Sequence, residues 1–179
     1  TISVAFLTTA AGTASPSEVS LEIPPSTAVE IHDVITTLFG FRAAGALRLR
    51  SDHEFEARSR TLNDGGDSGT FGQGIPAVAS DAALVDNRLL GAANRPGEGG
   101  TRTNLGILNP NPWNTTVYLW VFTGEGSTQT IGRQASVDLG PFGWRQVDLF
   151  DLVGAAAEDV ASATVTLASL GDGPVITYL

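Results

Sequence analysis

The chain has 179 residues, of which 42% are hydrophobic and 16% are charged, and its formal net charge is −9. These values are typical of a globular protein with room for one large or two small domains, and they exclude a disordered chain. The acidic balance argues against a basic face that binds nucleic acid or an anionic membrane surface. Because the sequence contains no Cys, it has no disulfide, no thiolate nucleophile and no Cys-ligated metal.

The composition also bears on where the protein works. No apolar run reaches the roughly 18–20 residues that a membrane-spanning helix needs, so we expect no insertion into a membrane. A chain without Cys that is rich in Ser, Thr, Gly and Ala is common among secreted bacterial proteins, so we expect an extracellular or cell-surface location. The first residue is Thr1 and not Met, which favours a processed or trimmed product.

In the first part of the chain, apolar and polar residues alternate as they do in strands with one buried face. Such runs cover residues 1–8, 19–23, 29–32, 46–51 and 55–61. Asp33 is predicted to cap a short helix that ends at Gly40. The last two runs are predicted to pair antiparallel, with their Arg and Glu side chains on one solvent-exposed face.

Turn-forming residues fill positions 63–69, and strand patterns resume after them. Strands are predicted at residues 71–78, 88–92, 102–108, 116–122, 133–139, 145–149, 163–169 and 175–179. A second short helix is predicted to start at Asp151. Asp33 and Asp151 stand at matching helix starts, so capping explains them better than a pair of glycosidase carboxylates.

The two parts of the chain repeat one pattern. The run VEIHDVI at 29–35 returns 118 positions later as VDLFDLV at 147–153. The same spacing aligns the apolar residues of 19–21 with those of 137–139, and those of 47–51 with those of 165–169. A register kept over about 30 residues indicates an internal duplication.

The predicted fold is therefore all-β, with two internally repeated Ig-like β-sandwich modules or one sandwich built from two equivalent halves. Each unit has one short helix between strands. We place the first unit at residues 1–79 and the second at 80–179. The second unit has a strand at 103–108 that the first lacks, and it stops short at its C-terminal end.

The two units thus begin and end at different points of the repeated pattern. This difference favours either a fragment of a longer array or a first unit without one edge strand. A missing edge strand leaves unpaired backbone groups and an open apolar groove. A strand from another chain can fill such a groove, as can residues 71–90 by folding back.

Three segments also carry a resemblance: RTNLGILNPNPWNTTVYLWVF, VDLGPFGWRQVDLFDLVG and SRTLNDGGDSGTFGQGIPAV. They resemble a tandem β-sandwich module that recurs in large secreted proteins of GC-rich bacteria, often beside proteases or other repeats. Together they cover most of the chain. The resemblance implies an extracellular, Ig-like accessory or scaffold role, and it implies no catalytic activity.

Few residues in the sequence are candidates for catalysis or metal binding. His32 precedes Asp33, but no G-x-S-x-G elbow supplies a nucleophile, and Phe150 takes the place of His32 in the second copy. Asn63, Asp64 and Asp67 lie in a Gly-rich turn that offers oxygen ligands for Ca²⁺, with His53 nearby in sequence. Their spacing fits no EF-hand loop, so a solvated turn is the favoured interpretation and Ca²⁺ the weaker one.

Aromatic residues gather in the second half of the chain. Tyr118 and Trp120 share one side of a strand whose other side carries Val117, Leu119 and Val121. With Trp113 and Trp144, they are the candidates for a contact with another protein or for stacking on sugar rings. A contact between modules is the favoured interpretation of these four residues.

The sequence thus predicts a non-catalytic structural or adhesive protein without a resident cofactor, serving as a building block of a surface or fibrous assembly or as an accessory module. Its expected partners are other protein chains, including copies of itself paired through β-edges. The alternatives are a carbohydrate-binding module with polysaccharide as ligand, and an accessory domain of a hydrolase. Asn114 begins an N-x-T pattern, which we expect to remain unmodified in a bacterium.

Overall fold

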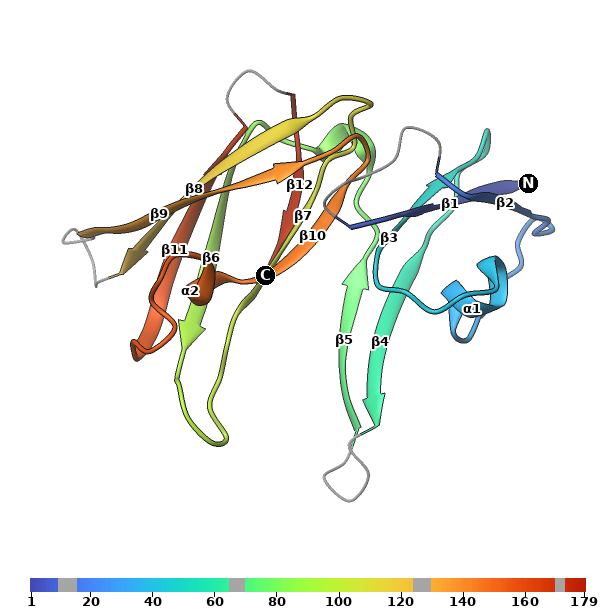
Figure 1. Ribbon diagram of the computed structural model, residues 1–179. Coiled ribbons are helices and arrows are strands. Elements are labelled where there is room, and N and C mark those ends of the chain that lie inside the picture. Colours follow the sequence, from blue (N-terminus) through green and yellow to red (C-terminus); the bar gives the residue numbers. More distant parts are fainter. Residues whose placement is uncertain (10–15, 65–69, 124–129, 170–172) are drawn as a thin grey trace.

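A computed structural model of the chain describes residues 1–9, 16–64, 70–123, 130–169 and 173–179 (Figure 1). Within these ranges the strands form four antiparallel sheets, and the helical elements are two short α-helices and one 3-10 turn. The protein is therefore all-β, as the alternating sequence pattern predicts.

The N-terminal part of the chain contributes two of the sheets. A three-stranded sheet has the order β2-β1-β3 and consists of β1 (Ile2–Leu7), β2 (Glu18–Leu21) and β3 (Ala46–Arg50). Helix α1 (Val34–Phe39) lies between β2 and β3 in the chain. Strands β4 (Arg58–Asp64) and β5 (Thr70–Pro76) form a separate hairpin that extends away from the other sheets (Figure 1).

The 3-10 turn η2 (Ser80–Ala82) leads into the C-terminal part, which contributes the other two sheets. A four-stranded sheet has the order β6-β11-β8-β9, and a three-stranded sheet has the order β10-β7-β12. The elements are β6 (Asp86–Asn94), β7 (Asn104–Leu108), β8 (Thr115–Thr123), β9 (Thr130–Leu139), β10 (Trp144–Asp148), α2 (Leu149–Leu152), β11 (Val160–Ala168) and β12 (Ile176–Tyr178).

These last two sheets share the main hydrophobic core. Along β8, Val117, Leu119 and Val121 are at most 1% exposed, as the alternation of that strand predicts. Leu105 and Ile107 of β7 meet them from the other sheet, and α2 adds Leu149 and Phe150. No described strand pair joins residues 1–79 to residues 80–179.

The sheet β2-β1-β3 has the same strand order as β9-β8-β11. Val4 pairs with Val19 in the first, as Val117 pairs with Val137 in the second. On the other side of β1, Val4 pairs with Leu49. The counterpart of Leu49 is Leu167, which pairs with Leu119, two residues along β8 from Val117. A two-residue shift keeps the same side chains on the same face, so the spacing of 118 positions links strands in equivalent places.

Two predicted strand arrangements are wrong. The runs 46–51 and 55–61 do not pair with each other, because β3 pairs with β1 and β4 pairs with β5. Residues 29–32 form no strand, and Val29 is 57% exposed. Their counterpart β10 is held by pairing with β7, and no described strand takes the place of β7 beside residues 29–32.

The predicted helices are present, but their caps differ from the prediction. Helix α1 follows Asp33 and ends at Gly40, whose φ of 77° is left-handed, yet the Asp33 side chain makes no capping hydrogen bond. Helix α2 is capped by Asp148 and not by Asp151. The Oδ1 atom of Asp148 accepts from the backbone N–H groups of Phe150 (3.1 Å) and Asp151 (3.2 Å), because β10 runs directly into the helix.

Strand β1 is buried on both faces, and the chain just after it contacts the second part. Val4 and Phe6 point to one side, and Ala5 and Leu7 point to the other, and all four are at most 4% exposed. Just beyond β1, the Thr8 carbonyl accepts a hydrogen bond from the backbone N–H of Trp144 at 3.0 Å. The first sheet is therefore attached directly to β10 of the second part.

A cation–π contact strengthens this junction. The guanidinium carbon of Arg48 lies 4.7 Å from the centre of the Phe142 ring. Burial lowers the pKa of Arg48, the nearby charge of Arg50 lowers it further, and Glu18 opposes the change. Arg48 thus serves as a partly desolvated cation between the first sheet and the β9–β10 connection.

Candidate functional site

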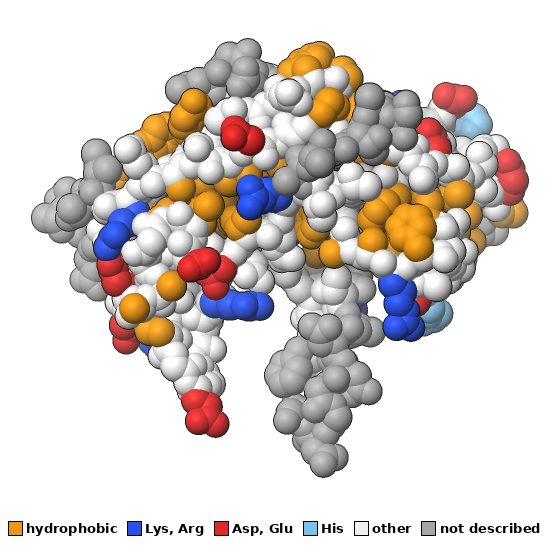
Figure 2. All heavy atoms as spheres, in the orientation of Figure 1, with side chains coloured by type: hydrophobic (Ala, Val, Ile, Leu, Met, Phe, Trp, Pro, Cys, Tyr) orange, Lys and Arg blue, Asp and Glu red, His pale blue; other side chains and the backbone are white. Residues whose placement is uncertain are grey.

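The first sheet has an apolar side that is only partly covered. We call it the open face, and it is the side that carries Val4 and Phe6. Residues paired directly across antiparallel strands point to the same side, so the open face also carries five other residues: Ile2, Val19, Leu21, Leu47 and Leu49. All five are partly exposed, and Figure 2 shows apolar side chains gathered at the surface over β1, β3 and α1.

The corresponding side of the second part is fully covered. Val137, Leu139, Val165 and Leu167, which match the open-face residues of β2 and β3, are at most 1% exposed. Their cover is the sheet β10-β7-β12 together with α2. The same sequence pattern therefore builds a closed core in one half and a half-covered face in the other.

Helix α1 and the residues after it provide the cover that the open face has. The Phe6 ring lies 5.7 Å from the Phe39 ring and 5.3 Å from the Phe41 ring, measured between ring centres. This aromatic cluster explains why Phe6 is 4% exposed, whereas Phe41 at its rim is 39% exposed. The cluster buries the middle of the sheet and leaves β2 and β3 only partly covered.

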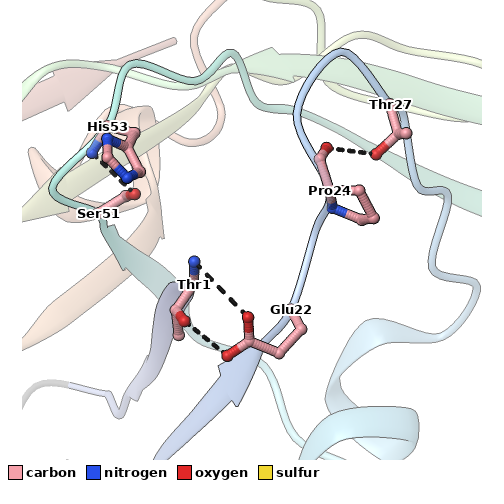
Figure 3. A network of polar contacts seen from close by, with 6 residues as sticks. All are labelled: Thr1, Glu22, Pro24, Thr27, Ser51 and His53. Atoms are coloured by element: carbon pink, nitrogen blue, oxygen red, sulfur yellow. Dashed lines mark hydrogen bonds and ion pairs between the residues drawn. The ribbon is translucent and has the colours of Figure 1, made fainter.

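Two connecting segments leave the sheet beside the start of β1, and we call them the flanking segments, residues 22–33 and 51–57. Figure 3 shows Ser51 and His53 on one side of Thr1, and Pro24 and Thr27 on the other. Glu22 accepts a hydrogen bond from the Thr1 hydroxyl at 2.6 Å and lies 3.9 Å from its ammonium group. The other contacts drawn, Thr27 to Pro24 and His53 to Ser51, are within one segment.

A second candidate surface lies on the outer side of the four-stranded sheet. We call Tyr118, Trp120 and Phe122 the aromatic row, since they share the face of β8 that points away from the core. Tyr118 is 41% exposed, while Trp120 and Phe122 are half-buried. Their neighbours across the strands carry polar groups: Ser136 beside Tyr118, Gln134 and Thr166 beside Trp120.

The other two predicted aromatic residues lie elsewhere. Trp144 is 9% exposed, and its indole N–H donates to the Tyr178 hydroxyl at 3.3 Å. Its backbone N–H donates to the Thr8 carbonyl, so it belongs to the junction with β1. Trp113 is 51% exposed and lies in the turn between β7 and β8. Of the four aromatic residues predicted as a contact surface, the structure therefore brings together Tyr118 and Trp120.

Sequence reasoning missed one apolar neighbour of the aromatic row. Leu90 of β6 is 71% exposed, and it is separated from Phe122 by Thr164 of β11 alone. Because Leu89 and Leu90 are adjacent, alternation did not show which of them faces outward. The pairing of β6 with β11 decides it.

The predicted Ca²⁺ candidates are not placed as a site. Asp67 lies outside the described residues, as do the side chains of Asn63 and Asp64, whose backbones belong to β4. In the described part of the chain, no group of three His or acidic residues is close enough to hold a metal ion. His32 is exposed with its Nε2 atom 3.7 Å from Glu30, and His53 is exposed as well.

None of the helices in the described ranges has the length and apolar content of a membrane span. Comparison of the chain with protein-family models, with curated proteins and with solved structures gave no match.

Proposed function

We propose that the protein is a non-catalytic structural module of an extracellular assembly, and that the open face is its contact with another protein chain. In this proposal, residues 80–179 form one Ig-like sandwich, and residues 1–79 form a less complete repeat of it. The likeness to tandem modules of secreted bacterial proteins supports the extracellular location, together with the composition. No cofactor takes part.

One observation carries the proposal. Four apolar side chains of the open face, those of Val19, Leu21, Leu47 and Leu49, remain partly exposed although their counterparts in the second half are buried. Covering apolar surface is favourable by about 25 cal/mol for each Å² removed from water. A contiguous exposed apolar surface of this kind is typical of a protein contact site.

The proposal predicts association that depends on the open face. We expect sedimentation analysis to show dimers or larger species that increase with concentration. Leu21→Lys should weaken this association at least tenfold, because it places a charge on the open face. Ser20→Lys is the matched control, since Ser20 is exposed and its side chain points to the opposite side of β2.

Circular dichroism of both variants reports whether the fold is kept. A chain that stays monomeric at every concentration contradicts the proposal, as does equal loss of association in the two variants.

A second candidate function is carbohydrate binding, which the aromatic row favours. Tyr118 and Trp120 expose ring surface beside hydroxyl and amide side chains, a combination suited to stacking on sugar rings and to hydrogen bonds with their hydroxyls. The partial burial of Trp120 fixes its ring against the sheet.

If this surface binds polysaccharide, Trp120→Ala is expected to weaken binding at least tenfold in affinity electrophoresis against a panel of soluble plant and bacterial polysaccharides. Trp113→Ala is the control, because Trp113 is the more exposed indole, at 51%, but lies in a turn outside the row. Retention that is the same for the unmodified chain and for Trp120→Ala removes this candidate.

A further inference from the structure

We infer that the open face binds one extended strand of another protein chain, with apolar residues at alternating positions and Arg beside them, in the manner of β7. The inference rests on the proposed use of the open face as a protein contact, and it specifies the form of the partner.

Strand β7 supplies the central part of the cover in the second half. It pairs antiparallel with β10 on one side and with β12 on the other. Leu105 and Ile107 point from it into the core and are 0% exposed. A single strand with two inward apolar residues thus joins the covering sheet and closes the core.

Among the described residues, the first half has the counterparts of these neighbours but no strand placed between them. At the spacing of 118 positions, residues 26–30 match β10, and residues 58–60 match β12. Residues 28–31 are in no strand, and residues 58–60 pair with β5. In the second half, Val147 of β10 pairs with Leu105, whereas its counterpart Val29 is 57% exposed.

The flanking segments therefore present both backbone and apolar side chains to an incoming strand. Val29 in one segment and Phe55 in the other are exposed at 57% and 43%. An extended peptide beside residues 28–31 gains main-chain hydrogen bonds, while its alternate side chains cover the open face. A folded partner surface offers apolar contact but does not supply these main-chain bonds.

The charge of the flanking segments indicates which residues the bound strand carries beside its apolar positions. The flanking segments carry six carboxylates and no Arg or Lys: Glu22, Glu30, Asp33, Asp52, Glu54 and Glu56. Glu22 lies near the Thr1 ammonium group and Glu56 pairs with Arg58, so the other four carry the charge available to a partner. β7 is preceded by Arg102 in the segment TRTNLGILN at 101–109. A strand with a positive charge next to its apolar residues is complementary to this acidic border.

The test uses the intact chain and a synthetic peptide with the sequence of residues 101–109. We expect saturable one-to-one binding by isothermal titration calorimetry. Amide shift changes in NMR spectra are expected at residues 2–6, 28–31 and 47–49. Peptides with Leu105→Ser and Ile107→Ser should bind at least tenfold more weakly, and they raise no question of protein folding.

Exchanging charges between the peptide and the chain tests the role of the carboxylates in the flanking segments. The Arg102→Glu peptide should bind the unmodified chain about fivefold more weakly, as for loss of a rim charge pair worth about 1 kcal/mol. The Glu30→Arg, Glu54→Arg variant of the chain should restore its binding. Both glutamates are exposed, so these substitutions leave the fold intact.

Absence of binding by the unmodified peptide overturns the inference, and so does equal binding of the serine peptides. Shift changes confined to β10 and β12 also overturn it, because the peptide would then be displacing β7 in the second half. Self-association that Leu21→Lys abolishes, without peptide binding, leaves the proposed function standing and removes only the strand form of the contact.

Discussion

Leu119→Ala is expected to lower the free energy of unfolding by about 3–5 kcal/mol, the range measured for large cavities in tightly packed cores. Leu119 is 0% exposed at the centre of β8, between Ala135 of β9 and Leu167 of β11. Its neighbours belong to strands fixed on both sides, so they have little freedom to collapse into the space. Urea denaturation followed by circular dichroism measures the change.

Leu90→Ala is the matched control, because the same substitution is made in the same sheet at a side chain that is 71% exposed. It should change the free energy of unfolding by less than about 0.5 kcal/mol. Similar losses for the two variants would contradict the assignment of the core to the inner face of β8.

The second large effect is expected at Asn109, whose side chain organises the turn between β7 and β8. Its Nδ2 atom donates to the carbonyl oxygens of Trp113 (2.7 Å) and Gly140 (2.9 Å). Its Oδ1 atom accepts from the backbone N–H and the Nδ2 of Asn111, at 3.0 and 2.8 Å. The residue is 0% exposed, so water cannot replace these partners once the side chain is lost.

Asn109→Ala should therefore cost about 3 kcal/mol or more in the free energy of unfolding, at roughly 1 kcal/mol for each lost hydrogen bond. Asn109→Asp should be no better tolerated, because it keeps the acceptor, loses both donors and buries a charge. Thermal unfolding compares these variants with Asn114→Ala, an exposed position in the same turn. A neutral Asn109→Ala would show that the turn forms without the network.

Local patterns predicted most elements because each depends on near neighbours in the chain. The alternation in β8 predicted that Val117, Leu119 and Val121 share one face, and Gly40 predicted the end of α1. The spacing of 118 positions predicted that β2 and β9, and β3 and β11, have equivalent places. Strands in equivalent places need apolar residues at equivalent positions, which is the physical basis of the predicted repeat.

The local sequence pattern did not show which strands pair with each other when they are far apart in the chain. Residues 46–51 and 55–61 both alternate, and nothing in either run shows that β3 pairs with β1 and β4 with β5. Residues 29–32 have the pattern of a strand, but a strand also needs a partner, which β7 provides only for β10. The hydrogen bond from Asn109 to Gly140 likewise crosses 31 positions, so the sequence showed a turn and not its network.

The candidate surfaces were predicted unevenly for the same reason. The parity of β8 predicted that Tyr118 and Trp120 share one face, but the junction role of Trp144 depends on β1, which is far away in the chain. The sequence pattern predicted either a fragment of a longer array or a first unit without one edge strand. Only the structure shows which apolar side chains the place of that strand leaves partly exposed.

The double burial of β1 has a mechanical consequence. A strand that packs against α1 on one side and adjoins β10 on the other cannot tilt without opening both contacts, and the Thr8–Trp144 hydrogen bond and the Arg48–Phe142 contact resist the same movement. We therefore expect the two parts of the chain to move as one rigid unit, and not as two modules joined by a flexible linker. Tension applied to one end would load the shared strand before it stretched any linker.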